Sequence, residues 1–418
     1  MKTFAFSLFA LAMLNLTAFA AEGDQLPTNF LSTKHALHLN NAGGLRGKGN
    51  IPTPHGFPLG ADTVVNFTGH FEAQGYYFDG SPRHIWEYSF IGNPPEHGGT
   101  TMINAPVVPV IIDMRNADGS PRFVNGQRLI SRPDAFLQPF MNGPVFNVAQ
   151  FSGSPAPTQV TDAEQRATFG QKARADWHTL LVPSVKTTRT MVLLRGTYRF
   201  ALNADGTCCA FVLVDAGTFG SLLFPPSTPD NSTVMGAAEV AGDVHTKDIS
   251  TFMFPNTYLY LNGDPNQCCV LGFHTFDVEA GDASNGNQTR FYVMNYSSWV
   301  SPGLFGAAFE DVTAVSHEMA EIFNDPFVGF DGIHNVTPFT QNPVGDCQDI
   351  LEVGDVTEDL PNSTFPVTID GYVYHPQTIA LLPWFAFEQN STAINNAYSY
   401  PDETVLPSLS APQGFACQ

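Results

Sequence analysis

Short apolar runs separated by turn residues make up most of the chain from about residue 60 onward. Runs of this length that are rich in β-branched or aromatic residues are typical of strands. The clearest examples are Val107–Ile112, Met191–Leu194, Phe211–Val214 and Phe291–Met294. Few stretches have the period of a helix, and Asp162–Ala175 is one of them. We therefore predict an α+β fold that is rich in strands.

The strongest helical pattern covers Leu304–Asn324, and Asp325-Pro326 ends it. One face of this helix is apolar and consists of Phe309, Val312, Val315, Met319, Ile322 and Phe323. The opposite face carries His317 and Glu321. Because these two residues are one helical turn apart, their side chains project side by side.

Residues 316–321 of this helix read Ser-His-Glu-Met-Ala-Glu. In the zinc-protease motif His-Glu-x-x-His, two histidines bind the metal and the Glu between them activates water. Here Glu321 stands at the second ligand position, and a carboxylate oxygen is an acceptable zinc ligand. The pattern suggests His317 and Glu321 as metal ligands and Glu318 as the general base. On the motif alone, a solvated polar helix face is an equally good interpretation.

The distribution of charge favours a bound cation. The chain has 18 basic and 39 acidic side chains, and its formal net charge of −21 argues against nucleic acid or an anionic membrane as a partner. Residues 291–418 contain 16 acidic residues and no Lys or Arg. Close carboxylates repel by roughly 1 kcal/mol per pair even in water. A divalent cation, a low pH or basic residues from the N-terminal half could relieve this repulsion.

A further ligand should come from outside the helix. Metzincins place one ten residues after the first histidine, and that position is Phe327, which excludes their pattern. Glu352 and Asp355, in the sequence Leu-Glu-Val-Gly-Asp, are the best candidates, and Gly354 between them permits a close backbone approach. Weaker candidates are Asp346 and His334.

The N-terminal sequence predicts export. Lys2, the apolar run Phe4–Phe19 and the ending Ala18-Phe19-Ala20 have the form of a signal peptide over residues 1–20. No second apolar span of membrane length follows, so we expect a secreted protein without a membrane anchor. Beyond residue 20, seven Asn-x-Ser/Thr sequons are typical of a secreted glycoprotein, and they begin at Asn66, Asn231, Asn287, Asn295, Asn335, Asn362 and Asn390.

Composition divides the chain into three parts. Residues 1–20 are the signal peptide, 21–58 are a Gly/Pro-rich flexible segment or propeptide, and 59–418 form one domain with a weakly marked boundary near 150–180. An even number of cysteines in a secreted chain suggests up to three disulfides that staple the C-terminal half. We expect each adjacent pair to bond elsewhere, and the cysteines are Cys208, Cys209, Cys268, Cys269, Cys347 and Cys417.

These motifs together resemble a group of secreted microbial and fungal proteins. The shared pattern is His-Glu-Met-Ala-Glu at 317–321, Asp-Pro at 325–326 and Glu-Val-Gly-Asp at 352–355. Members of the group are regarded as zincin-like metalloproteases, and a fainter similarity to plant phosphate-induced, exordium-like proteins rests on the same helix. The resemblance implies a zincin-like active-site helix and a Zn²⁺ site. It also implies His317, Glu321 and Asp355 as ligands and Glu318 as general base.

Two functions follow as hypotheses. The first is a secreted zinc-dependent peptidase, in which the metal lowers the pKa of bound water and Glu318 accepts its proton. Its partner is a protein or peptide substrate, and Tyr372, Tyr374 and His375 are candidate proton donors. The second is a non-catalytic glycoprotein of the cell wall or surface with a structural ion, for which Ca²⁺ would suit the oxygen-rich segment. His274, next to Phe273, is expected to be a core histidine rather than a ligand.

Overall fold

The protein is described by a computed structural model that covers residues 23–37, 61–72, 85–226, 230–306, 308–329 and 334–409. The predicted signal peptide and Cys417 lie outside these residues. Within them, no helix combines the length and the apolar character that a membrane crossing requires.

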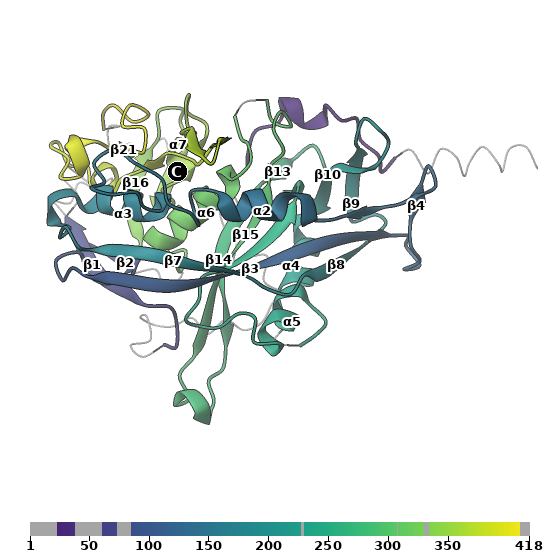
Figure 1. The fold of residues 1–418 in the computed structure, drawn as a ribbon, viewed down its shortest axis with the longest axis horizontal. Helices are drawn as coiled ribbons and strands as arrows, with labels where there is room; N and C mark the ends of the chain where they lie inside the picture. The colour runs from purple at the N-terminus through teal and green to yellow at the C-terminus, as the bar shows by residue number, and fades with distance from the viewer. Residues whose placement is uncertain are drawn as a thin grey trace, which may run out of the picture.

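The molecule is built on a seven-stranded mixed sheet (Figure 1). Its strands are β3 (Thr100–Arg115), β6 (Ile130–Ser131), β7 (His178–Val185), β8 (Arg189–Leu194), β11 (Ser250–Pro255), β14 (Gly272–Glu279) and β15 (Arg290–Trp299). The order is β14-β15-β11-β3, and the long strand β3 pairs in parallel with β7 along its first half and with β8 along its second. The mixed α+β prediction is confirmed, and all four predicted apolar runs lie within strands.

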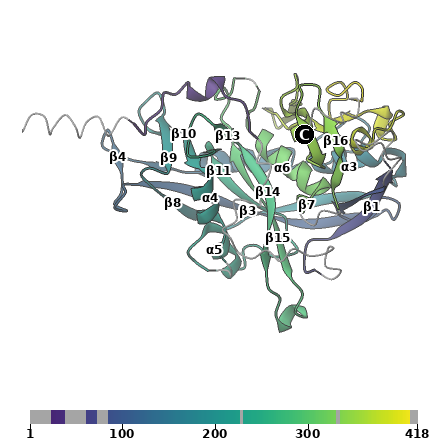
Figure 2. The ribbon, with the colours of Figure 1, turned by 180° about the vertical axis from the view of Figure 1, so that it is seen from behind.

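A second, four-stranded sheet has the order β13-β12-β10-β9. Its strands are β9 (Tyr198–Leu202), β10 (Cys208–Asp215), β12 (Thr257–Tyr260) and β13 (Cys268–Val270). Residues 23–37, from the segment predicted to be flexible, pack against this sheet (Figure 2). Leu31 is fully buried there, and the Leu37 amide donates to the Cys269 carbonyl at 2.8 Å. Whether residues 21–58 are removed stays a prediction.

Helix α6 (Thr313–Asn324) is the predicted motif helix, although it starts later than expected. It packs on β14 and β15, next to α3 (Val160–Phe169). Residues before Thr313 are not helical, because Asp311 has a left-handed φ of 42° and its backbone pairs with that of Val300. The helix ends at Asn324, as predicted, and α3 ends before the predicted Ala175, because Gly170 has a φ of 50°.

Short C-terminal elements cover α6 on the side away from the sheet (Figure 1). They are β16 (Val336–Gln341), β17 (Cys347–Ile350), α7 (Asp355–Glu358), β18 (Val367–Ile369), β19 (Tyr372–Tyr374), β20 (Ile379–Ala380), α8 (Leu382–Phe385) and β21 (Ser399–Tyr400). Apolar side chains of this region pack beneath them, including Leu351, Val353, Val356 and Trp384. Helix α6 is therefore enclosed between the large sheet and the C-terminal region.

The predicted cysteine pairing is wrong. Cys208 bonds to Cys209, and Cys268 bonds to Cys269. Strand β12 separates β10 from β13, and Cys268 is in register with Asp215 through Tyr260. Cys209 is six residues further along β10, roughly 20 Å away at the usual rise of a strand, so the two pairs are far beyond the reach of a disulfide. Neither bond joins distant parts of the chain. Cys347 is also disulfide-bonded.

Two predicted glycosylation sequons are inaccessible in the folded chain. The Asn295 side chain is fully buried and donates to the Thr251 hydroxyl at 3.1 Å. Asn335 is 1% exposed and donates to the Ser89 carbonyl at 3.2 Å. A glycan on either amide would require the surrounding core to open, so these two sites are excluded in the folded state.

A buried acidic cluster away from the motif helix leads to a pH-dependent stability prediction. It joins Glu239 on α5 (Val234–Val240) to Asp277 and Glu279 on β14. Burial and the charges of Asp277 and Glu279 raise the pKa of Glu239 to about 9. Burial and Asp277 raise the pKa of Glu279 to about 7. The folded protein therefore retains protons that the unfolded chain releases above its ordinary carboxyl pKa, so stability falls as pH rises through this range.

We expect Glu239→Gln to raise the free energy of unfolding by about 1–3 kcal/mol at pH 8 and by much less at pH 5. The amide keeps the shape of the side chain and removes the need to hold a proton. Urea unfolding at both pH values, with a chelator present, measures the difference. Glu96→Gln, at an exposed carboxylate, is the control. An equal effect of Glu239→Gln at both pH values would contradict the assignment.

Candidate metal centre

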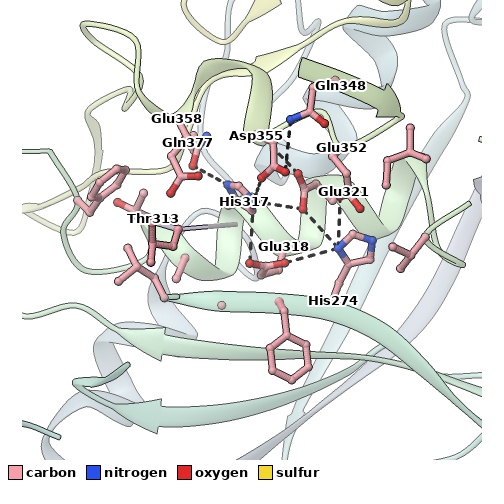
Figure 3. A pocket seen from close by; sticks show the side chains of 18 of the residues that line it. His274, Thr313, His317, Glu318, Glu321, Gln348, Glu352, Asp355, Glu358 and Gln377 are labelled. Carbon is pink, nitrogen blue, oxygen red and sulfur yellow. Dashed lines mark hydrogen bonds and ion pairs between the residues drawn. The ribbon is translucent and has the colours of Figure 1, made fainter. Parts of the chain in front are cut away.

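A cavity of about 130 Å³ lies between α6, β14 and the segment that runs from β17 into α7 (Figure 3). Two histidines and six carboxylates line it, and among these eight residues Asp349 alone is exposed: His274, His317, Glu318, Glu321, Asp349, Glu352, Asp355 and Glu358. Helix α6 supplies three of them, β14 supplies His274, and the segment from β17 to α7 supplies the rest. Among the described residues, those lining the cavity include no Lys or Arg.

His317 is held with one ring nitrogen facing carboxylates. Its Nδ1 lies 2.9 Å from the Gln377 side-chain oxygen, an acceptor, so Nδ1 carries the hydrogen. Its Nε2 lies 3.2 Å from Glu321 Oε2 and 3.3 Å from Asp355 Oδ1. A histidine with one ring nitrogen tied to the protein and the other facing anionic oxygens has the usual arrangement of a metal-binding histidine.

His274 has the same arrangement, with its nitrogens exchanged. Its Nε2 donates to the Asp325 backbone carbonyl at 3.0 Å. Its Nδ1 lies 3.3 Å from Glu321, 3.5 Å from Glu318 and 3.8 Å from Glu352. The residue is buried, as expected of a core histidine, but it faces the cavity. Its position on β14, which packs against α6, could not be read from local spacing.

Two glycines allow these side chains to approach so closely. A Cβ on Gly354 would lie 2.7 Å from His317 Nδ1, and one on Gly272 would lie 2.6 Å from Glu318 Oε1. Both distances are shorter than a real carbon contact. The prediction that Gly354 permits a close backbone approach is confirmed. The Gly354 and Asp355 amides also donate to Glu321 Oε1, at 3.1 and 3.3 Å.

Burial and mutual repulsion shift the charge states of the carboxylates. Burial raises the pKa of Glu318, and the positive charge that His317 can carry opposes this. Burial together with the charge of Glu321 raises the pKa of Glu352 well above its ordinary value. Burial opposes ionisation of Glu321, yet His317 and His274 hold its pKa well below the ordinary value. Burial and mutual repulsion therefore oppose full ionisation of these carboxylates, and a bound cation would relieve both.

The structure brings together the five residues predicted for the site, although Glu352 faces His274 rather than His317. The weaker candidates do not join them. Asp346 is exposed, and His334 lies 3.5 Å from Glu87. The predicted proton donors are also outside the described lining, and His375 instead pairs with Asp311 at 2.8 Å. Sequence analysis missed His274, Gln377 and Glu358 as cavity residues.

No family model, curated protein or solved structure matches this chain. The resemblance to zincin-like proteins thus rests on the motif residues alone. The donor set itself fits zinc, because it combines imidazole nitrogens of fixed tautomer with carboxylate oxygens. The Gln377 amide and the Asp325 carbonyl would be its outer partners.

Proposed function

We propose that the protein is a secreted zinc-dependent peptidase. The observation that carries the proposal is the convergence of Glu321 and Asp355 on His317 Nε2, while Gln377 fixes the opposite nitrogen. His317, Glu321 and Asp355 would hold the ion. A bound zinc lowers the pKa of water and polarises a carbonyl. The predicted signal peptide supports export, and the formal net charge of −21 gives no support to a nucleic-acid substrate.

Glu318 is the candidate general base in this proposal. It follows His317 directly on α6, is 4% exposed, and its Oε1 lies 3.9 Å from His317 Nε2. A base must be near the ion without being screened by bulk water, and its pKa must approach neutrality. Burial raises the pKa of Glu318 in that direction. Its role would be to accept a proton from water and return it to the leaving amine.

The alternative is a non-catalytic glycoprotein in which a structural ion holds the C-terminal region against α6. Burial is the observation that favours it, because His317 is 8% and Glu321 is 2% exposed. Leu37, Phe309 and Val328 add apolar walls to the cavity. A polypeptide needs a path to the metal, whereas a structural ion does not. Calcium would suit this function better than zinc, because carboxylates outnumber the imidazoles.

Metal analysis and chelation test the proposal. We expect the purified protein to contain zinc and to hydrolyse casein, and we expect dialysis against 1,10-phenanthroline to lower the rate by at least about tenfold. Zinc, but not calcium, should restore the rate. Elemental analysis and release of labelled casein fragments measure the two quantities. Calcium alone in the protein, or hydrolysis that survives complete removal of zinc, would contradict the peptidase proposal.

A further inference from the structure

The donors of the cavity divide into two sets. Atoms of His274, Glu318 and Glu321 lie within 4.8 Å of one another, and so do atoms of His317, Asp355 and Glu358. Each set contains one histidine, and each histidine has its other nitrogen tied to the protein. A single ion bound by both imidazoles would require the two ring nitrogens to belong to one such set, and they belong to different sets. The geometry instead provides two places where a cation would meet one nitrogen and at least two oxygens.

Glu321 lies between these two places. Its Oε2 is 3.3 Å from His274 Nδ1 and 3.2 Å from His317 Nε2, so one oxygen faces both imidazoles (Figure 3). The other oxygen, Oε1, is occupied by the Gly354 and Asp355 amides, which fixes the carboxylate in this orientation.

Glu318 spans the same gap with its two oxygens. Oε2 lies 3.5 Å from His274 Nδ1, and Oε1 lies 3.9 Å from His317 Nε2. A carboxylate that offers one oxygen to each of two positions is the arrangement of a bridging ligand. Paired metal ions in hydrolases are about 3.5–4 Å apart, a separation that a bridging carboxylate can span.

The charge of the cavity also fits two ions better than one. Six carboxylates line it, five of them buried or partly buried, without a Lys or Arg among the described lining residues. If the five buried or partly buried carboxylates were ionised, one dication would leave three negative charges unbalanced, whereas two dications would leave one. Unbalanced buried charge is costly, since its desolvation is compensated only by a counter-ion or by protonation.

We propose that this cavity binds two divalent cations, with Glu318 and Glu321 as bridges. His317, Asp355 and Glu358 would bind the first ion. His274 would bind the second through Nδ1, and Glu352 Oε2 lies 3.8 Å from that nitrogen. One nitrogen and several oxygens per ion suit Zn²⁺ or Mn²⁺. The inference rests on the metal site of the proposed function and adds a second ion to it. Glu318 would then bind metal in addition to any role as a base.

Zinc stoichiometry is the test. We expect chelator-treated wild-type protein, loaded with Zn²⁺ and dialysed, to retain two zinc ions per chain by elemental analysis. His274→Gln should retain one, because it removes the only nitrogen of the second set. His178→Gln, at a histidine that pairs with Asp162 outside the described lining of the cavity, should retain two. One zinc ion in the wild type would overturn the second ion and leave the peptidase proposal standing, whereas no zinc would overturn both.

Two further measurements test the two-ion proposal even if the His274→Gln variant does not fold or binds no metal. The wild type loaded with two equivalents of Co²⁺ should give the weakened electron paramagnetic resonance signal of two coupled ions, whereas one equivalent gives a stronger signal per ion. Two uncoupled Co²⁺ signals would overturn the proposal, since the ions would then be far apart. Two zinc ions in a folded His274→Gln variant would also overturn it, because the second ion would lie elsewhere.

Discussion

Replacing Glu318 with Gln is expected to lower kcat/KM for peptide hydrolysis by about 10²–10⁴-fold, the usual contribution of a general base. The amide has nearly the same shape as the carboxylate but cannot accept a proton. The zinc ion held by His317, Glu321 and Asp355 should remain, because the substitution leaves those three ligands in place. Weaker binding is expected at the second ion of the two-ion proposal, which Glu318 would bridge. Initial rates on a fluorogenic peptide, together with zinc analysis of the same sample, separate lost chemistry from lost metal.

Glu310→Gln is the matched control for this experiment. Glu310 lies just before α6, is also partly buried, and is not among the described residues that line the cavity. It should retain the wild-type rate. Equal activity of Glu318→Gln and wild type would remove the base role from Glu318. No hydrolysis by either protein would instead favour the structural function.

The strand-rich part of the fold was predictable because its core strands are buried on both faces. Val107 and Ile112 of β3 are both fully buried, so the apolar run is continuous, as in other central parallel strands. The start of α6 was not predictable in the same way. Phe305 and Phe309 continue the apolar spacing upstream, but they pack from a loop into a separate core with Tyr258. Apolar spacing reports burial, and here burial without a helix produced the same pattern.

For the metal centre too, residues on one helix were predictable from the sequence, whereas residues on distant elements were not. His317 and Glu321 are one helical turn apart, so their proximity follows from α6 alone. His274 and Gln377 lie on other elements and reach His317 or its carboxylates only because β14 and the C-terminal region pack on opposite sides of that helix. The vicinal disulfides were missed for a related reason, since the distance between Cys209 and Cys268 depends on strand order and register.

Substitution of Gly354 by Ala is expected to weaken zinc binding by about 10–100-fold, as loss of an outer partner of a metal ligand does. Gly354 has a φ of −78° and a ψ of −41°, which Ala adopts readily, so the backbone itself would not be strained. The added Cβ would instead lie 2.7 Å from His317 Nδ1. The ring can move away only by losing its hydrogen bond to Gln377 or its approach to Asp355.

The matched control is Gly217→Ala, in α4 (Ala216–Leu223), where the nearest atom to a new Cβ is Asp215 Oδ1 at 3.4 Å. Competition with a chelator gives the zinc affinity, and thermal unfolding in excess chelator reports on the fold without metal. Weaker zinc binding by Gly354→Ala, beyond any change in the metal-free fold, is the expected result. Unchanged affinity would mean that His317 does not bind the ion through the geometry described, because the ring cannot keep that position beside a Cβ.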